Sequence, residues 1–189
     1  MNPFSVHPLT REHREHTMGQ QAHIFWLTGL SGAGKSTLAR GLEQRLQQAG
    51  KKTILLDGDI MRSGLNRDLG FSDEDRTENI RRMGEVNRLF FEAGLIVINA
   101  FIAPFQRDRD NVRLLFPENR FSEIHVHASL DECIRRDPKG LYAKVNRGEI
   151  PAFTGIQSPY EVPLRPELKI EDRKSTRLNS SHANISYAV

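Results

Sequence analysis

The chain reads GLSGAGKS from Gly29 to Ser36, which fills every fixed position of the pattern G-x-x-x-x-G-K-[ST]. A short apolar run rich in β-formers, HIFWLT at residues 23–28, comes directly before it and has the character of a buried parallel strand. Residues 36–49 follow with leucines at helical spacing, and Gly50 supplies a C-terminal stop. The glycine-rich stretch is therefore expected in the turn between a strand and a helix.

That position suits a phosphate-binding loop. Glycines let the backbone curl so that successive N–H groups converge on phosphate oxygens, and the helix N-terminus adds partial positive charge. The lysine of the pattern reaches the β- and γ-phosphates, and the hydroxyl after it holds Mg²⁺. We predict a nucleoside triphosphate site with a magnesium ion on Ser36. The residues expected to hold the nucleotide are Gly29, Ser31, Gly32, Ala33, Gly34, Lys35, Ser36 and Thr37.

The rest of the chain alternates strand-like and helix-like segments. Further strands are expected at 53–57, 95–101 and 123–128, and residues 168–171 are strand-like. Ser72 opens a helix with the shape of a capping box that runs to about Ala93, and Ser129 caps a short helix that ends before Pro138. Such alternation implies βαβ units and a parallel sheet. We predict a three-layer α/β fold, like that of P-loop kinases, with about five parallel strands.

Length and composition exclude several classes of protein. A chain of 189 residues with 27% charged and 38% hydrophobic residues fits one globular domain. The longest apolar run, residues 95–98, is far too short for a membrane span, and the first residues lack the apolar core of a secretory signal. A single cysteine suits a reducing compartment, and a net charge of +3 with interspersed signs gives no nucleic-acid surface. We expect a cytoplasmic protein without membrane or nucleic-acid partners.

Composition also suggests three regions. Residues 1–21 are polar and are expected to form an N-terminal arm, and residues 22–173 carry the domain. Residues 174–189 are rich in serine and asparagine and lack periodicity, so we expect a disordered tail or a segment foreign to the domain, such as a read-through.

A second group of polar residues follows the second expected strand. Asp57 and Asp59 stand at its carboxyl end, where parallel sheets place their ligands. One carboxylate there can orient Mg²⁺ and its water, and another can accept the proton of an attacking hydroxyl. The arginines beyond them favour an anionic acceptor over a plain solvated surface; they are Arg62, Arg76, Arg81 and Arg82. No N-K-x-D base-reading motif of a GTPase is present, so a kinase is the better interpretation.

Eight segments now form a recognisable series. They are GLSGAGKST (29–37), DGD (57–59), GLN (64–66), DLGFS (68–72), ENIRR (78–82), FIAPF (101–105), RDPKGLY (136–142) and FTGI (153–156). In this order and spacing they resemble the adenylylsulfate kinase family, from about Thr10 to about Ile170. The block from 57 to 82 and the segment 136–142 are far more specific than the phosphate loop.

The resemblance implies an activity and an acceptor site. Such enzymes transfer the γ-phosphoryl group of ATP to the ribose 3′-hydroxyl of adenosine 5′-phosphosulfate (APS), giving 3′-phosphoadenosine 5′-phosphosulfate (PAPS) and ADP in sulfate assimilation. The family pattern puts arginine forks and an amide on the phosphosulfate and phenylalanines around the adenine, although ordinary core packing of the phenylalanines stays open. The expected substrate-binding residues are Arg62, Phe71, Arg76, Asn79, Ile102, Lys144 and Phe153.

The resemblance also suggests catalytic roles. Lys35 and Arg136 are expected to stabilise charge on the transferring group, Asp59 to orient or deprotonate the acceptor hydroxyl, and Asp57 to support Mg²⁺ beside Ser36. The division of labour between the two aspartates stays open. Residues 136–148 resemble a mobile lid, which would exclude water from the reaction. A simple exposed loop is the alternative.

Three features depart from the family pattern. Ala103 stands where many relatives have serine, so a phosphoserine cannot form there and direct in-line transfer is the expected route. Gln106 replaces a basic residue, which is expected to weaken an anion contact. The last amphipathic helix of the family is missing after residues 168–171, and we expect this to lower stability by exposing apolar surface.

Two other functions remain open at this point. One is a P-loop kinase for another small acceptor, such as a nucleoside monophosphate or a sugar acid. The other is a catalytically impaired nucleotide-binding remnant of a sulfurylase–kinase fusion. As partners beyond APS we expect a functional link to ATP sulfurylase and, since relatives are often dimers, a homodimer.

Overall fold

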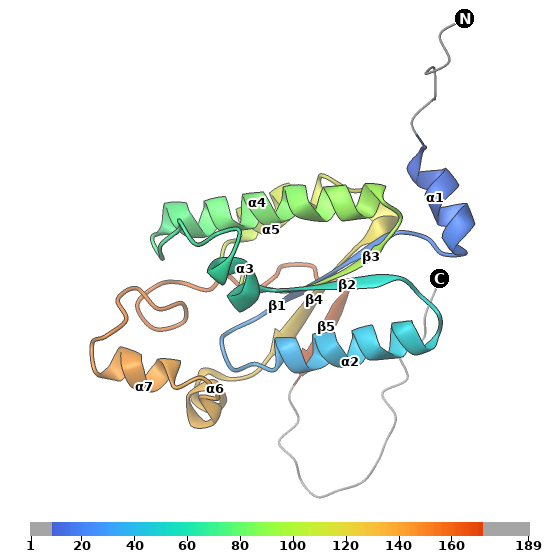
Figure 1. Ribbon diagram of the computed structural model, residues 1–189. Helices are drawn as coiled ribbons and strands as arrows, with labels where there is room; N and C mark the ends of the chain where they lie inside the picture. Colours follow the sequence, from blue (N-terminus) through green and yellow to red (C-terminus); the bar gives the residue numbers. More distant parts are fainter. Residues whose placement is uncertain (1–8, 172–189) are drawn as a thin grey trace, which may run out of the picture.

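The computed structural model describes residues 9–171, which form a three-layer α/β fold (Figure 1). A parallel sheet in the order β2-β3-β1-β4-β5 makes the middle layer, which confirms the predicted sheet of five strands. The strands are β1 (His23–Thr28), β2 (Thr53–Asp57), β3 (Ile96–Ala100), β4 (Phe121–His127) and β5 (Leu168–Glu171).

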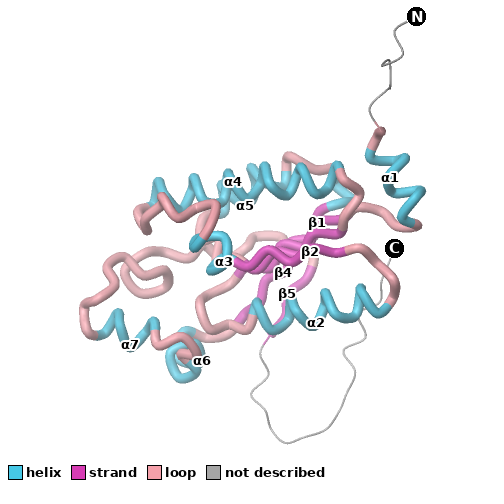
Figure 2. Tube along the Cα trace, viewed as in Figure 1, coloured by secondary structure: helices cyan, strands magenta, loops and turns pink. Residues whose placement is uncertain are grey.

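Helices cover both faces of this sheet, as Figure 2 shows. One face carries α4 (Asp73–Glu92) and α5 (Gln106–Arg113). The other carries α2 (Lys35–Gln48), with α6 (Leu130–Arg136) and α7 (Leu141–Asn146) beyond the carboxyl ends of the strands.

The alternation of side chains along β1 builds a core on each side of the sheet. Ile24 and Trp26 are fully buried in the cluster that includes residues of α4 and α5. Leu27 points the other way, into the cluster that packs against α2. Because successive side chains of a strand face opposite sides, one apolar run serves both layers.

The capping signals seen in the sequence are present. Ser72 accepts a hydrogen bond from the backbone N–H of Asp75 at the start of α4, and Ser129 accepts one from Glu132 at the start of α6. Each hydroxyl satisfies one of the N–H groups that a helix start leaves without an intrahelical partner.

Several elements differ from the expectation. The third and fourth strands span 96–100 and 121–127 in place of 95–101 and 123–128. Four helices were not expected as such; they are α1 (Arg11–Met18), α3 (Gly58–Ser63), α5 and α7. Each has only six to eight residues, which is too few turns for an apolar periodicity to mark it.

Helix α1 forms within the segment expected to be an arm. Its Glu15 is buried, and the Glu15 carboxylate accepts a hydrogen bond of 2.7 Å from the backbone N–H of Ala22 just before β1. Gly19, at φ +61°, ends the helix. In Figure 1 this helix lies at the edge of the sheet opposite to α3, α6 and α7. The predicted 174–189 tail and the missing final helix lie outside the described residues.

The topology sets the position of the site. The loops that follow β1, β2 and β3 leave the sheet at its carboxyl edge, beside α3, α6 and α7 (Figure 1). Open α/β sheets bind their ligands at this edge. In the part of the chain from 9 to 171, no helix is long and apolar enough to cross a membrane.

Candidate active site

A cleft of about 830 Å³ opens at the carboxyl edge of the sheet. Its walls come from the phosphate loop, α3, the segment after β3 and the region around α6. Most of the expected site residues line it; they are Ser31, Gly32, Gly34, Lys35, Ser36, Thr37, Asp57, Asp59, Arg62, Phe71, Arg76, Asn79, Ile102, Arg136 and Phe153.

Three expected residues are not on the walls of this cleft. Gly29 is the first residue of the phosphate loop, and its carbonyl accepts a hydrogen bond from Lys35, whereas Ala33 is buried in the core. Lys144 is exposed on α7. Gln106 lies at the start of α5, where its side chain bonds Asp110 and Arg109, and it does not line the cleft either.

The phosphate loop has the conformation that its glycines allow. Gly32 and Gly34 have φ values of +80° and +98°, in the left-handed region that side chains disfavour. A Cβ on Gly32 would also lie 3.1 Å from the carbonyl oxygen of Cys133, a contact so tight that the backbone at Cys133 would have to shift. The loop therefore depends on glycine for both conformation and space.

Lys35 lies at the centre of the loop and is only 8% exposed. Its ammonium donates hydrogen bonds of 2.9 Å to the carbonyl of Gly29 and 2.7 Å to that of Leu30. Burial, together with the positive charge of Lys139, lowers the pKa of Lys35 to about 8. A triphosphate bound in the loop would supply the negative charge that this buried cation lacks.

Ser36, at the start of α2, and Asp57, at the end of β2, form an oxygen-rich pair. The Ser36 hydroxyl donates a hydrogen bond of 2.7 Å to Asp57, whose other carboxylate oxygen accepts one of 3.0 Å from the backbone N–H of Asp59. Hydroxyl and carboxylate oxygens suit Mg²⁺, which keeps several waters and uses one or two protein groups beside substrate phosphates. Among residues 9–171, no cluster of three or more histidine, cysteine or acidic residues is placed to hold a metal ion.

Asp59 faces the segment expected to be a lid. Its carboxylate forms an ion pair with Lys139, which lies between α6 and α7. Asp137 caps α7 by accepting hydrogen bonds from the N–H groups of Tyr142 and Ala143, and the Tyr142 hydroxyl donates one of 2.9 Å to the carbonyl of Ser31. The segment is therefore connected to both α3 and the phosphate loop.

The opposite wall carries an aromatic ring between two arginines. The guanidinium carbons of Arg62 and Arg76 lie 4.6 and 5.9 Å from the centre of the Phe71 ring. Phe71 is 55% exposed, so its ring is free to contact a ligand and does not serve the core. Phe153 is both a core residue, packed edge-on to Tyr142 at 5.1 Å, and a cleft residue.

Hydrogen bonds fix the arginine and the amide behind this ring. Arg76 donates to the carbonyls of Phe71 and Ala152 and to the hydroxyl of Thr154. Asn79 is 6% exposed, and its side-chain oxygen accepts a hydrogen bond of 2.9 Å from the amide of Asn66. Burial lowers the pKa of Arg76, an unfavourable effect that a bound anion would offset.

The structure separates two of the four arginines from the site. Arg81 and Arg82 pair with Glu78 on the surface of α4, and Arg82 also pairs with Asp68. Arg136, the last residue of α6, lines the cleft and pairs with Glu132 at 2.8 Å.

Sequence reasoning missed several polar residues at the site, among them Arg40 on α2, which lines the cleft, and three residues in the family-like segments. Asn66, Lys139 and Thr154 contact expected site residues, and Lys139 and Thr154 also line the cleft. All three lie inside the family-like segments GLN, RDPKGLY and FTGI. Their position in those segments is the sequence signal that could have identified them as site residues.

Comparison with known proteins agrees with this arrangement. A family model described as adenylylsulphate kinase matches residues 21–171. The adenylyl-sulfate kinase of Bacillus velezensis is 55% identical over 169 residues, covering 89% of this chain and 86% of that protein. The adenylyl-sulfate kinase of Shewanella oneidensis is 52% identical over 181 residues, covering 96% of this chain and 88% of that protein.

A solved structure shows the same fold with ligands. The Mycobacterium tuberculosis APS kinase CysC, in complex with AMPPNP and APS, is 43% identical and superposes with a TM-score of 0.78, over 82% of this chain and 91% of that one. A hexameric APS kinase from Thiobacillus denitrificans is 39% identical with a TM-score of 0.58, over 79% of this chain and 25% of that one. The family model and the curated relatives show that this chain belongs to the adenylylsulfate kinase family.

Proposed function

We propose that the cleft transfers the γ-phosphoryl group of ATP to the 3′-hydroxyl of APS, as in the family to which the chain belongs. The observation that carries this proposal is that a single cleft joins the phosphate loop around Lys35 to the wall formed by Arg62, Phe71 and Arg76. One end supplies a triphosphate site, and the other supplies cations and an exposed ring for a sulfated adenylate.

The proposed reaction uses the residues between the two ends. The 3′-oxygen attacks the γ-phosphorus, the bond between the γ-phosphorus and the β,γ-bridging oxygen breaks, and the hydroxyl proton passes to the carboxylate of Asp59. Lys35 and Arg136 stabilise the charge that develops on the phosphoryl oxygens. Mg²⁺ on Ser36 and Asp57 would neutralise the β- and γ-phosphates when bound.

Two features of the chain refine this mechanism. Ala103 lines the cleft without a hydroxyl, which supports direct transfer to APS over a phosphoserine intermediate at this position. Lys144 is exposed on α7, so its proposed contact with the acceptor requires the segment around α7 to move inward.

The cellular setting is proposed from the chemistry. A single cysteine and the family's substrate support a cytoplasmic enzyme that receives APS from an ATP sulfurylase. The hexameric relative supports an assembly of more than one copy, for which a homodimer is the simplest form.

A coupled assay of ADP release tests the function. We expect ADP from ATP and Mg²⁺ to form at a substantial rate only when APS is present, and Arg76→Met to raise the KM for APS while the KM for ATP changes less than twofold. Release of ADP with AMP or gluconate would instead support a kinase for another acceptor. Binding of ATP without any acceptor-dependent ADP would support the non-catalytic alternative.

A further inference from the structure

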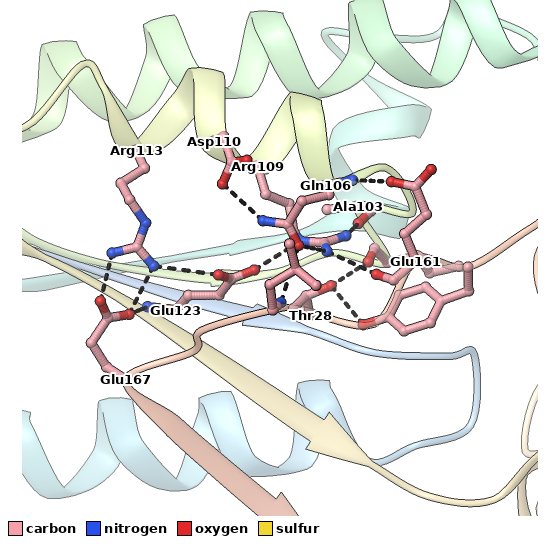
Figure 3. A network of polar contacts seen from close by, with 12 residues as sticks. Thr28, Ala103, Gln106, Arg109, Asp110, Arg113, Glu123, Glu161 and Glu167 are labelled. Carbon is pink, nitrogen blue, oxygen red and sulfur yellow. Dashed lines mark hydrogen bonds and ion pairs between the residues drawn. The ribbon is translucent and has the colours of Figure 1, made fainter.

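Arg109 is a buried arginine beneath the acceptor half of the cleft. It lies on α5, its side chain is 1% exposed, and it does not line the cleft. Its guanidinium donates hydrogen bonds of 2.7 Å to the carbonyl of Ala103 and 2.8 Å to that of Glu161, and its Nε lies 2.8 Å from Glu123 on β4 (Figure 3). One side chain therefore contacts three segments that are distant in the sequence.

The first of these segments has a conformation that needs support. Ala103 has a φ of +46° and is 2% exposed, and the left-handed region is unfavourable for a residue with a Cβ. Ile102, Ala103 and Pro104 all line the cleft. The Ile102 carbonyl accepts a hydrogen bond from the Thr28 hydroxyl, so two consecutive carbonyls of this segment are held by buried donors.

The second segment leads from Phe153 and Thr154, which line the cleft, to Glu161. Besides the bond from Arg109, the Glu161 backbone N–H donates to the carbonyl of Pro104 at 2.9 Å. The Tyr160 hydroxyl lies 3.1 Å from that of Thr28. Arg109 is therefore at the point where the two segments join.

The charge of Arg109 is neutralised inside the protein. Glu123 is 2% exposed and pairs with Arg109, and Arg113 at the outer end of the network pairs with both Glu123 and Glu167 (Figure 3). A buried ion pair of this kind is weak evidence for stability, but it holds the guanidinium fork in a fixed orientation.

We propose that Arg109 is a positioning residue for APS: its fork holds segment 102–104 and segment 153–161 in register, and so shapes the acceptor wall without touching the substrate. The inference rests on the proposed placement of APS at that wall. Neither segment belongs to the phosphate loop, so the binding of ATP should be independent of Arg109.

Steady-state kinetics with APS and with ATP as the varied substrate test this. We expect Arg109→Gln to raise the KM for APS at least tenfold while the KM for ATP stays within twofold of the wild type. Arg109→Lys keeps the positive charge near Glu123 but lacks the fork, so it should show most of the same change. Arg113→Gln is the matched control, because it removes the two ion pairs that Arg113 makes with Glu123 and Glu167 in the same network, and Arg113 bonds neither segment. Both KM values should stay within twofold of the wild type.

A second variant and a second measurement test the proposal even if Arg109→Gln does not fold. Thr28→Val removes the donor to Ile102 without breaking an ion pair, and it should also raise the KM for APS more than that for ATP. Hydrogen exchange should become faster at 101–105 and 153–161 in Arg109→Lys, but not at 29–37.

Each outcome either supports or overturns the proposal. An unchanged KM for APS in folded Arg109→Lys, equal rises in both KM values, or exchange that is faster throughout the chain would overturn it. If wild-type enzyme releases no ADP with APS, the proposed function fails, and the exchange pattern then decides the positioning role of Arg109 by itself.

Discussion

The ion pair between Lys139 and Asp59 connects the segment over the cleft to α3. We expect Lys139→Met to weaken the attachment of this segment to α3 without unfolding the protein. Lys169 provides a matched control on β5, because its ion pair with Glu171 has nearly the same exposure: 49% and 63% for the two side chains, against 48% and 65% for Lys139 and Asp59. A difference in kcat/KM between the two variants therefore results from where the ion pair lies and not from the loss of an exposed lysine–carboxylate pair as such.

The exposure of the pair sets the size of the effect. Ion pairs this accessible to solvent contribute about 0.2–1 kcal/mol, and 1 kcal/mol corresponds to about a fivefold change in an equilibrium. We expect kcat/KM for APS to fall about 1.4- to fivefold in Lys139→Met, with a melting temperature within about 4 °C of the wild type. Lys169→Met should leave kcat/KM unchanged.

The assay compares kcat/KM of wild type and Lys139→Met at low salt and at 1 M salt. At 1 M salt the screening length is about 3 Å, so the ratio of the two kcat/KM values should approach one. ADP release without APS should rise in the variant, because an opened segment admits water to the γ-phosphate. A ratio that salt does not change would refute this role of the Lys139–Asp59 ion pair. A loss above about fiftyfold would also refute it and would instead place Lys139 on the reacting groups.

Three other perturbations follow from the site and its surroundings. Phe71→Ala should raise the KM for APS about tenfold through lost stacking on the adenine, while the free energy of unfolding changes by less than about 0.5 kcal/mol; an unchanged KM would remove Phe71 from the substrate site. Asp57→Asn should raise the Mg²⁺ concentration for half-maximal rate about tenfold, measured by metal titration at saturating ATP, and an unchanged requirement would separate Asp57 from the ion. Burial lowers the pKa of His125 from 6.5 to about 4, so the unfolded chain binds more protons between these values and stability falls as the pH drops from 6.5 to 4. Between pH 6.5 and pH 4, the free energy of unfolding measured with urea should fall about 2 kcal/mol less in His125→Gln than in the wild type. The same dependence on pH in both proteins would contradict this.

The parts of the fold that the sequence predicted are those with a local signal. The residues of β1 and β2 form short apolar runs with β-branched or aromatic members, and both strands match the expected bounds. The start of α4 was predictable because Ser72 caps it with its own hydroxyl. In each case the information lies within a few residues of the element it defines.

One of the missed helices, α5, depends on partners far along the chain. Helix α5 has the sequence QRDRDNVR, which suggests a solvated surface, yet Asp108 and Arg109 are both buried in it. Asp108 accepts a hydrogen bond from Thr77 on α4, and Arg109 pairs with Glu123 on β4. Because a charge can be buried only where a partner compensates it, no local pattern of α5 could reveal this burial.

The same reasoning separates the two halves of the cleft. The phosphate loop is one continuous stretch whose glycines, lysine and serine act on a single ligand, so its residues could be listed from the sequence. The acceptor wall is assembled from residues after β2, at the start of α4, after β3 and around Phe153, and its shape depends on contacts such as that between Arg109 and the carbonyl of Ala103. On the proposed role of Arg109, specificity for the acceptor depends on a residue that never reaches the ligand. Substitutions at buried polar positions of α5 should therefore change APS kinetics more than many substitutions on the open rim of the cleft.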